Sequence, residues 1–160
     1  MKILLVNKYF NMHGGSETYF FGLADLLRQA GHEVIFFAMQ DEKNLACEQS
    51  AYFVSNVEFN GELTATQKLK AAFRMVYSFE AKKKISALIE KEKPDLVVID
   101  SIQTMRCTDV ASSSGTVSQV KESSARFLNV AKTNEIPTFI VGHVNKDGAI
   151  AGPKVMEHIV

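Results

Sequence analysis

A strand–loop–helix–strand pattern at the amino terminus constrains the fold of this chain more than any other feature. Residues 2–7 carry a continuous apolar run, which is typical of parallel strands covered on both faces. Gly14 and Gly15 follow as a loop, and a helical pattern then extends to Gly31, where glycine favours a helix end. Residues 33–39 read as a second strand. This order predicts a βαβ unit with a right-handed crossover.

The first predicted helix begins at Ser16, a residue type that caps helix amino termini well. Glu17 then falls in the first turn, where the helix dipole favours an acidic side chain. The apolar positions that define this helix are Tyr19, Leu23, Leu26 and Leu27.

Strand and helix patterns continue to alternate along the rest of the chain. A short strand is expected at residues 52–59. A helical pattern covers residues 64–93, where a break near Tyr77-Ser78 would make two helices or one bent helix. A buried strand, an amphipathic helix and another buried strand are expected at residues 96–100, 117–134 and 137–142. The inner face of the amphipathic helix is predicted to be Val117, Val120, Ala125, Leu128 and Ala131. Together these patterns predict a single α/β domain over residues 1–160. We expect a doubly wound, Rossmann-like parallel sheet of about five strands with helices on both faces.

Composition excludes several classes of function. Lysine plus arginine and aspartate plus glutamate both number 18, so charge does not favour nucleic-acid binding. No apolar run approaches the length of about 18 residues that spans a bilayer, so no membrane partner is expected. Cys47 and Cys107 lie far apart without a ligand cluster, and two free thiols indicate a reducing cytoplasm. The cluster Lys82-Lys83-Lys84 is interpreted as a solvated helix face.

The Gly14-Gly15-Ser16 loop is the first candidate site. Glycines there let a ligand approach the backbone, and the helix amino terminus offers unpaired N–H groups and partial positive charge to a phosphate. A plain structural turn would carry the same glycines, so both interpretations remain open.

Residues 1–95 resemble the amino-terminal domain of family 4 retaining glycosyltransferases, which have the GT-B architecture. The matching segments are residues 2–7 (KILLVN), the Gly14-Gly15-Ser16-Glu17 loop, residues 26–34 (LLRQAGHEV) and residues 85–95. The resemblance implies that Gly14, Gly15 and Ser16 approach the diphosphate of a nucleotide-sugar donor and its acceptor. It also implies that most donor contacts come from a second Rossmann-like domain. His13 and His32 are expected to be structural.

Residues 94–160 resemble the bacterial RadA-type DNA-repair ATPases of the RecA superfamily. The matching segments are residues 99–105 (IDSIQTM), 115–122 (GTVSQVKE), 139–144 (FIVGHV) and 148–153 (GAIAGP). The resemblance implies that Asp100, beside Ser101, serves a magnesium ion at the nucleotide and that His143 lies where the nucleotide state is sensed. Asp100 could equally be a solvent-facing acid at the end of a strand.

Each resemblance lacks a part of its chemistry. The sequence has no Gly-x-x-x-x-Gly-Lys-Ser/Thr phosphate loop, and the strand after Pro94 carries no histidine. We therefore expect a recombined α/β chain, joined between residues 95 and 96, that needs no cofactor and has no catalytic residues. One alternative is a weak nucleotide or phosphate module at the carboxyl edge of the sheet, built from Gly14, Gly15, Ser16, Asp100, Ser101 and His143. The other is a fragment of a glycosyltransferase amino-terminal domain. The sequence leaves oligomeric state, and natural or engineered origin, open.

Overall fold

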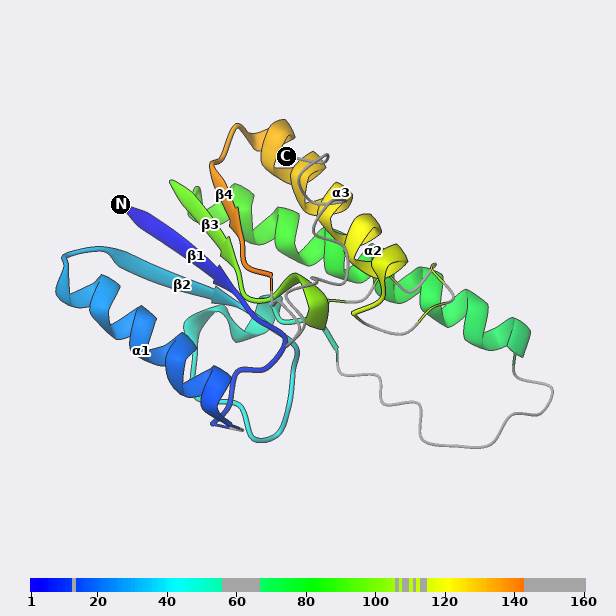
Figure 1. The fold of residues 1–160 in the computed structure, drawn as a ribbon, viewed down its shortest axis with the longest axis horizontal. Helices are drawn as coiled ribbons and strands as arrows, with labels where there is room; N and C mark the ends of the chain where they lie inside the picture. Colours follow the sequence, from blue (N-terminus) through cyan, green and yellow to red (C-terminus); the bar gives the residue numbers. More distant parts are fainter. Residues whose placement is uncertain are drawn as a thin grey trace, which may run out of the picture.

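Four parallel strands form one sheet at the centre of the molecule (Figure 1). The structure is a computed structural model that describes residues 1–12, 14–55, 67–105, 107, 110, 112 and 115–142, with the backbone alone for 67–79. The strands are β1 (Lys2–Val6), β2 (Glu33–Phe37), β3 (Leu96–Ile99) and β4 (Thr138–Ile140), in the order β2-β1-β3-β4. The α/β class is confirmed. The expectation of about five strands is corrected to four within the described residues.

β1 pairs with one strand from the glycosyltransferase-like part of the sequence and one from the RadA-like part. It pairs in parallel with β2 from Lys2↔Glu33 to Val6↔Phe37, and with β3 from Ile3↔Leu96 to Val6↔Ile99. Every residue of β3 therefore lies beside a residue of β1, across the predicted junction. Apolar residues occupy both faces of these strands, which explains why their sequences read as continuous apolar runs.

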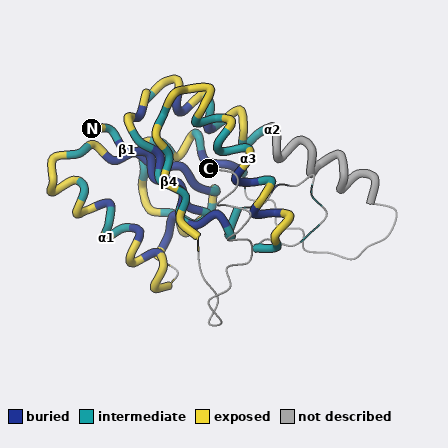
Figure 2. Tube along the Cα trace, turned by 45° about the horizontal axis from the view of Figure 1, so that its top comes forward, coloured by how far each residue is buried: buried dark blue, intermediate teal, exposed yellow. Residues whose placement is uncertain are grey.

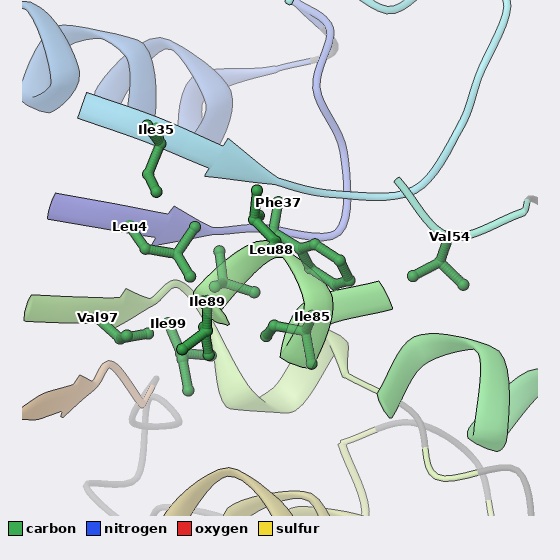
Figure 3. Packing of buried hydrophobic residues seen from close by; sticks show 10 residues of the cluster. Leu4, Ile35, Phe37, Val54, Ile85, Leu88, Ile89, Val97 and Ile99 are labelled. Carbon is green, nitrogen blue, oxygen red and sulfur yellow. The ribbon is translucent and has the colours of Figure 1, made fainter. Parts of the chain in front are cut away.

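Helices cover the sheet on both sides. Helix α1 (Gly15–Gln29) packs on one face, whereas α2 (Gln67–Glu92) and α3 (Val117–Asn134) lie on the other (Figure 1). Leu4, Ile35 and Val97 point toward Leu88 and Ile89 of α2, as Figure 3 shows. Alternate residues of the same strands point toward α1, as expected for a strand period of two.

Helix α1 begins earlier than predicted. Its N-cap residue is Gly14, two residues before Ser16, and its first residue is Gly15. One side of α1 is buried and the other is exposed (Figure 2). Phe20 and Ala24 lie on the buried side, whereas Tyr19 and Leu26 are exposed. The sequence carries apolar residues on two sides of this helix, and the aromatic rings of Phe10 and Phe36 pack against the Phe20 side. The end at Gly31 is confirmed, with a left-handed φ of 82°.

The strand expected at residues 52–59 is wrong for the part that the structure describes. Residues Glu48–Tyr52 form the 3-10 helix η1, and Val54 makes only an isolated parallel bridge to Met39. Side chains of α2 form hydrogen bonds with Phe53 and Ser55 of this segment. The Lys84 ammonium donates to the Phe53 carbonyl at 2.6 Å, and the Glu80 carboxylate accepts from the Ser55 hydroxyl at 2.8 Å. These contacts hold the segment against α2.

The long helix is continuous, so the expected break near Tyr77 is absent from its backbone. No helix in the described ranges is both long enough and apolar enough to cross a membrane. The α2 helix ends before Pro94, as expected, with Lys93 in a left-handed conformation.

The bounds of α3 are confirmed, but its predicted inner face is only partly correct. The structure buries Gln119, Val120, Ser123 and Ser124, and leaves Val117 exposed. β4 was expected to be buried, yet the Phe139 side chain is 64% exposed. Phe139 lies on the α1 side of the sheet, and α1 packs over the β2-β1 half of that side.

Candidate functional site

The carboxyl ends of β1 and β3 form the natural place for a ligand. After β1 the chain leads to α1 on one face, and after β3 it leads to η2 (Ile102–Thr104) and α3 on the other. Neighbouring strands whose connections diverge in this way define a topological switch point, where open α/β sheets bind ligands. The Asp100 backbone N–H donates to the Val6 carbonyl at 2.9 Å, so the pairing of the two strands continues to this edge.

The α1 amino terminus lies on the β1 side of this switch point. Gly14 is the extended N-cap residue, and its carbonyl accepts both the backbone N–H and the hydroxyl of Thr18 at 3.2 Å. The N–H groups of Gly15, Ser16 and Glu17 precede the first residue that can find an acceptor inside the helix. Unpaired N–H groups and the partial positive charge of the helix dipole make such a helix end suited to an anion.

Neither glycine of this loop is required by packing within the described residues. A Cβ at Gly15 would meet no described atom within 4 Å, and one at Gly14 would meet only the Glu17 carboxylate at 3.5 Å, an ordinary contact. Gly14 has an extended backbone that any residue adopts. The glycines therefore leave open space beside the helix amino terminus.

Glu17 lies in the first turn of α1, as predicted, but its burial was not predicted. Its side chain is buried, and its carboxylate accepts a hydrogen bond from the Ser16 hydroxyl at 2.9 Å. A carboxylate in the first turn is stabilised by the helix dipole. It also places negative charge where a phosphate would approach, and it can accept hydrogen bonds from ligand hydroxyls. The sequence placed Glu17 in the first turn and in the Gly14-Gly15-Ser16-Glu17 loop, but no local pattern indicated its burial.

Asp100 and Ser101 lie on the β3 side of the switch point. The Ser101 carbonyl accepts the backbone N–H of Thr104 at 3.1 Å and the Thr104 hydroxyl at 2.8 Å. The Ser101 side chain is 2% exposed, and its hydroxyl has no hydrogen-bond partner among the described residues. Buried hydroxyls are normally paired, so this hydroxyl is an exception among the described residues at this edge of the sheet.

The described residues contain no group of three or more potential metal-ligating side chains. The magnesium role of Asp100 therefore remains a prediction. His143 and His13 lie outside the described residues. His32 lies at the opposite edge of the sheet, in the turn between α1 and β2, and its backbone N–H donates to the Leu27 carbonyl at 3.0 Å.

Gln119 holds the segment that follows η2. Its side-chain oxygen accepts the Cys107 backbone N–H at 2.8 Å. Its amide nitrogen lies within hydrogen-bond distance of three carbonyls, those of Cys107, Val110 and Ser112, at 2.8 to 3.0 Å. The sequence did not indicate this role of Gln119, because the inner face of α3 was predicted from apolar side chains only.

Comparison with known proteins shows the family to which this chain belongs. Residues 13–108 match the sequence profile described as Glycosyltransferase Family 4. The chain belongs to glycosyltransferase family 4. The matched range contains Gly14, Gly15, Ser16, Asp100 and Ser101, and it extends past the junction predicted between residues 95 and 96.

The family 4 chain also has RadA-like sequence. The DNA repair protein RadA of Bacillus subtilis is 53% identical over 76 residues, which are 48% of this chain and 17% of RadA. RadA of Aquifex aeolicus is 44% identical over 109 residues, which are 63% of this chain and 24% of RadA. Both resemblances predicted from the sequence are confirmed. Each aligned stretch is longer than the part of the chain outside residues 13–108, so the two similarities overlap.

Solved glycosyltransferases also align with this family 4 chain. SsfS6 from Streptomyces sp. SF2575, complexed with thymidine diphosphate, aligns with a TM-score of 0.40 and 17% identity, covering 86% of this chain and 37% of SsfS6. SnogD from Streptomyces nogalater aligns with a TM-score of 0.41 and 18% identity, covering 91% of this chain and 43% of SnogD. The chain spans less than half the length of each of these proteins and of the two RadA relatives.

Proposed function

We propose that these 160 residues form a ligand-binding α/β domain of mixed lineage that does not turn over a substrate by itself. The proposed ligand is a nucleotide or nucleotide sugar, bound weakly at the carboxyl edge of the sheet. The observation that carries this proposal is the open space that the described residues leave at Gly15, beside N–H groups that have no acceptor within α1.

Polar groups on both sides of the switch point fit such a ligand. The N–H groups of Gly15 and Ser16 would donate to a diphosphate. On the other side, the buried Ser101 hydroxyl would exchange a hydrogen bond with a ligand hydroxyl or phosphate oxygen.

The Glu17 carboxylate sets the expected strength of binding. Its charge opposes a phosphate at the same helix end, although it could accept hydrogen bonds from ribose or sugar hydroxyls. We therefore expect dissociation constants of about 1 mM. A magnesium ion at Asp100 would strengthen binding by offsetting this charge.

The absence of turnover is proposed on chemical grounds. ATP hydrolysis needs a loop that cradles the phosphates and a lysine that bridges them, and the sequence has no Gly-x-x-x-x-Gly-Lys-Ser/Thr string. In the glycosyltransferase interpretation, the resemblance assigns most donor contacts to a second domain. The pairing of β1 with β3 supports an origin by recombination, because both segments can share one sheet. The two free cysteines favour a cytoplasmic location.

Calorimetry with ATP, ADP and UDP-sugars, each with and without magnesium, tests the binding proposal. We expect weak heats that saturate in the millimolar range and increase with magnesium. An absence of heat from all ligands at several millimolar would remove the binding proposal. Product release from ATP or a UDP-sugar in the same samples would instead overturn the proposed lack of turnover.

A further inference from the structure

Helix α1 presents an uncharged apolar stripe to solvent. With 100° between successive residues, one side of the helix carries Gly15, Tyr19, Gly22, Leu23, Leu26 and Ala30. The Tyr19 and Leu26 side chains, one heptad apart, are 68% and 64% exposed. We call these six residues the α1 stripe.

The α1 stripe is separate from the helix face that holds α1 on the sheet. Phe20 and Ala24 occupy that buried face, where Phe20 meets the rings of Phe21 and Phe36 with centroids 5.5 and 5.9 Å apart. An amphipathic surface helix normally has one apolar stripe, with polar residues opposite. The second stripe, with two large exposed apolar side chains, is therefore the side of α1 that can bury further apolar surface against a partner.

We propose that the α1 stripe binds the same stripe of a second copy of this chain, with the two helices antiparallel. The stripe is self-complementary about a point between Gly22 and Leu23. A two-fold axis at this point places Tyr19 opposite Leu26 of the partner, Gly22 opposite its Leu23, and Gly15 opposite its Ala30. Tyr19 and Leu26 then pack against each other at both ends, and the Leu23 side chain of each copy fills the space beside Gly22 of the other. The same patch thus meets itself, as an isologous interface requires.

Two further observations select a copy of the chain as the occupant. The only cation on α1, Arg28, lies half a turn from Tyr19, where it stacks 5.2 Å from the Phe36 ring and pairs with Asp25 at 3.4 Å. The stripe thus offers no positive charge to lipid headgroups or nucleic acid. A Cβ at Gly22 would meet nothing within 4 Å, so a second helix can approach closely at the crossing point.

The size of the stripe makes the dimer weak. An aromatic side chain buries about 150–250 Å² at most. Two tyrosines and two leucines from one pair of short helices therefore fall below the total of about 1,200 Å² typical of stable complexes. The dimer should form only at high micromolar concentrations and dissociate on dilution.

Sedimentation equilibrium of the full chain from about 10 µM to 1 mM tests this association. We expect the mass to rise from monomer toward dimer across this range, and Tyr19→Glu and Leu26→Glu to remain monomeric throughout. Phe139→Lys, which places a charge at a large exposed apolar side chain outside the stripe, should dimerise like the unmodified chain. A monomeric unmodified chain, or a dimer that survives Tyr19→Glu or is lost in Phe139→Lys, would overturn the proposal.

Disulfide trapping tests the antiparallel arrangement. Because a disulfide requires Cα atoms within about 7 Å, Tyr19→Cys should crosslink to Leu26→Cys in an equimolar mixture but neither variant to itself. The unmodified chain, oxidised in parallel, controls for Cys47 and Cys107. Tyr19→Cys homodimers would show a parallel pairing and contradict the two-fold axis. Circular dichroism of each variant confirms that α1 remains folded.

Discussion

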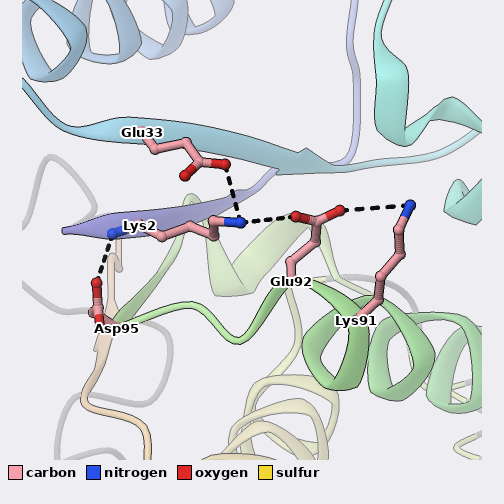
Figure 4. Close-up of polar contacts among 5 residues, drawn as sticks. All are labelled: Lys2, Glu33, Lys91, Glu92 and Asp95. Atoms are coloured by element: carbon pink, nitrogen blue, oxygen red, sulfur yellow. Dashed lines mark hydrogen bonds and ion pairs between the residues drawn. The ribbon is translucent and has the colours of Figure 1, made fainter.

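The Lys2 ammonium lies 3.0 Å from the Glu92 carboxylate and ties β1 to the last turn of α2 (Figure 4). The same ammonium lies 3.0 Å from Glu33 at the start of β2, and the Lys2 backbone N–H donates to Asp95 at 2.6 Å. Lys91 approaches the other Glu92 oxygen at 3.7 Å. These groups join β1, β2, α2 and the segment before β3 at the edge of the sheet opposite the candidate site.

Glu92→Gln should make stability less dependent on pH in the acid range. The hydrogen bond from Lys2 lowers the pKa of Glu92, and this outweighs the opposing effect of burial. A lowered folded pKa adds stability that is fully present above the ordinary value of about 4.3 and is lost as the pH falls through the folded value. Urea midpoints at pH 7, 5 and 3 should therefore fall less in Glu92→Gln than in the unmodified chain. If the urea midpoint changed equally with pH in both proteins, the Lys2 contact would contribute nothing to the stability of the fold.

Gly15→Ala should separate binding from folding at the candidate site. A methyl group there meets no described atom, and Gly15 is the first residue of α1. Because alanine reduces the entropy of the unfolded chain, stability should rise by about 0.4–1 kcal/mol in urea. Nucleotide heats should fall several-fold, since the methyl group occupies the space that a ligand would use. A stable variant with undiminished binding would place the ligand elsewhere.

Glu17→Gln should strengthen phosphate binding. The substitution removes the negative charge beside the α1 amino terminus but keeps an oxygen that can accept the Ser16 hydrogen bond. At a partly buried site, an unfavourable charge of this kind weakens anion binding by about 1 kcal/mol, or several-fold in affinity. ADP titrations at low and high salt measure the effect, which salt should reduce. Weaker binding in Glu17→Gln would mean that the carboxylate contacts ligand hydroxyls more than it repels phosphate.

The parts of the fold that the sequence predicted are those buried on two sides. A run such as Ile3–Val6 is typical of a central parallel strand. Gly31 and Pro94 follow the ends of α1 and α2, the helices that precede β2 and β3. The predictions were wrong where a helix has more apolar residues than its neighbours can cover, or where polar side chains are buried. The apolar pattern of α1 included Tyr19 and Leu26, which are exposed, because nothing local distinguishes the two apolar sides of this helix.

The sequence predicted two parts of the candidate site, the glycine loop after β1 and the residues at the end of β3. Gly14, Gly15, Asp100 and Ser101 lie on the carboxyl edge because parallel strands bring their carboxyl ends together. Burial of Glu17 depends on tertiary contacts around α1, which no local pattern encodes.

Gln119 and Ser124 should respond oppositely to removal of their polar groups. Gln119→Leu leaves the Cys107 N–H and the carbonyls near it without their partner, at about 1–3 kcal/mol for each buried group that water cannot reach. We expect a loss of about 2–4 kcal/mol in total. The buried Ser124 hydroxyl has no hydrogen-bond partner among the described residues, so Ser124→Ala on the same helix should stabilise by about 0.5–1 kcal/mol. Urea unfolding of both variants provides the comparison. A destabilised Ser124→Ala would reveal a partner for this hydroxyl.

Leu88→Ala should weaken the glycosyltransferase-like and RadA-like parts together. Leu88 of α2 is fully buried in the cluster that contains Leu4 of β1 and Ile99 of β3 (Figure 3). Removing it should cost about 2–5 kcal/mol. Because β1 and β3 share this cluster, hydrogen exchange should accelerate by the same factor in both strands if the sheet unfolds as one unit. Faster exchange in β1 with unchanged protection in β3 would show that the two lineages fold separately within one sheet.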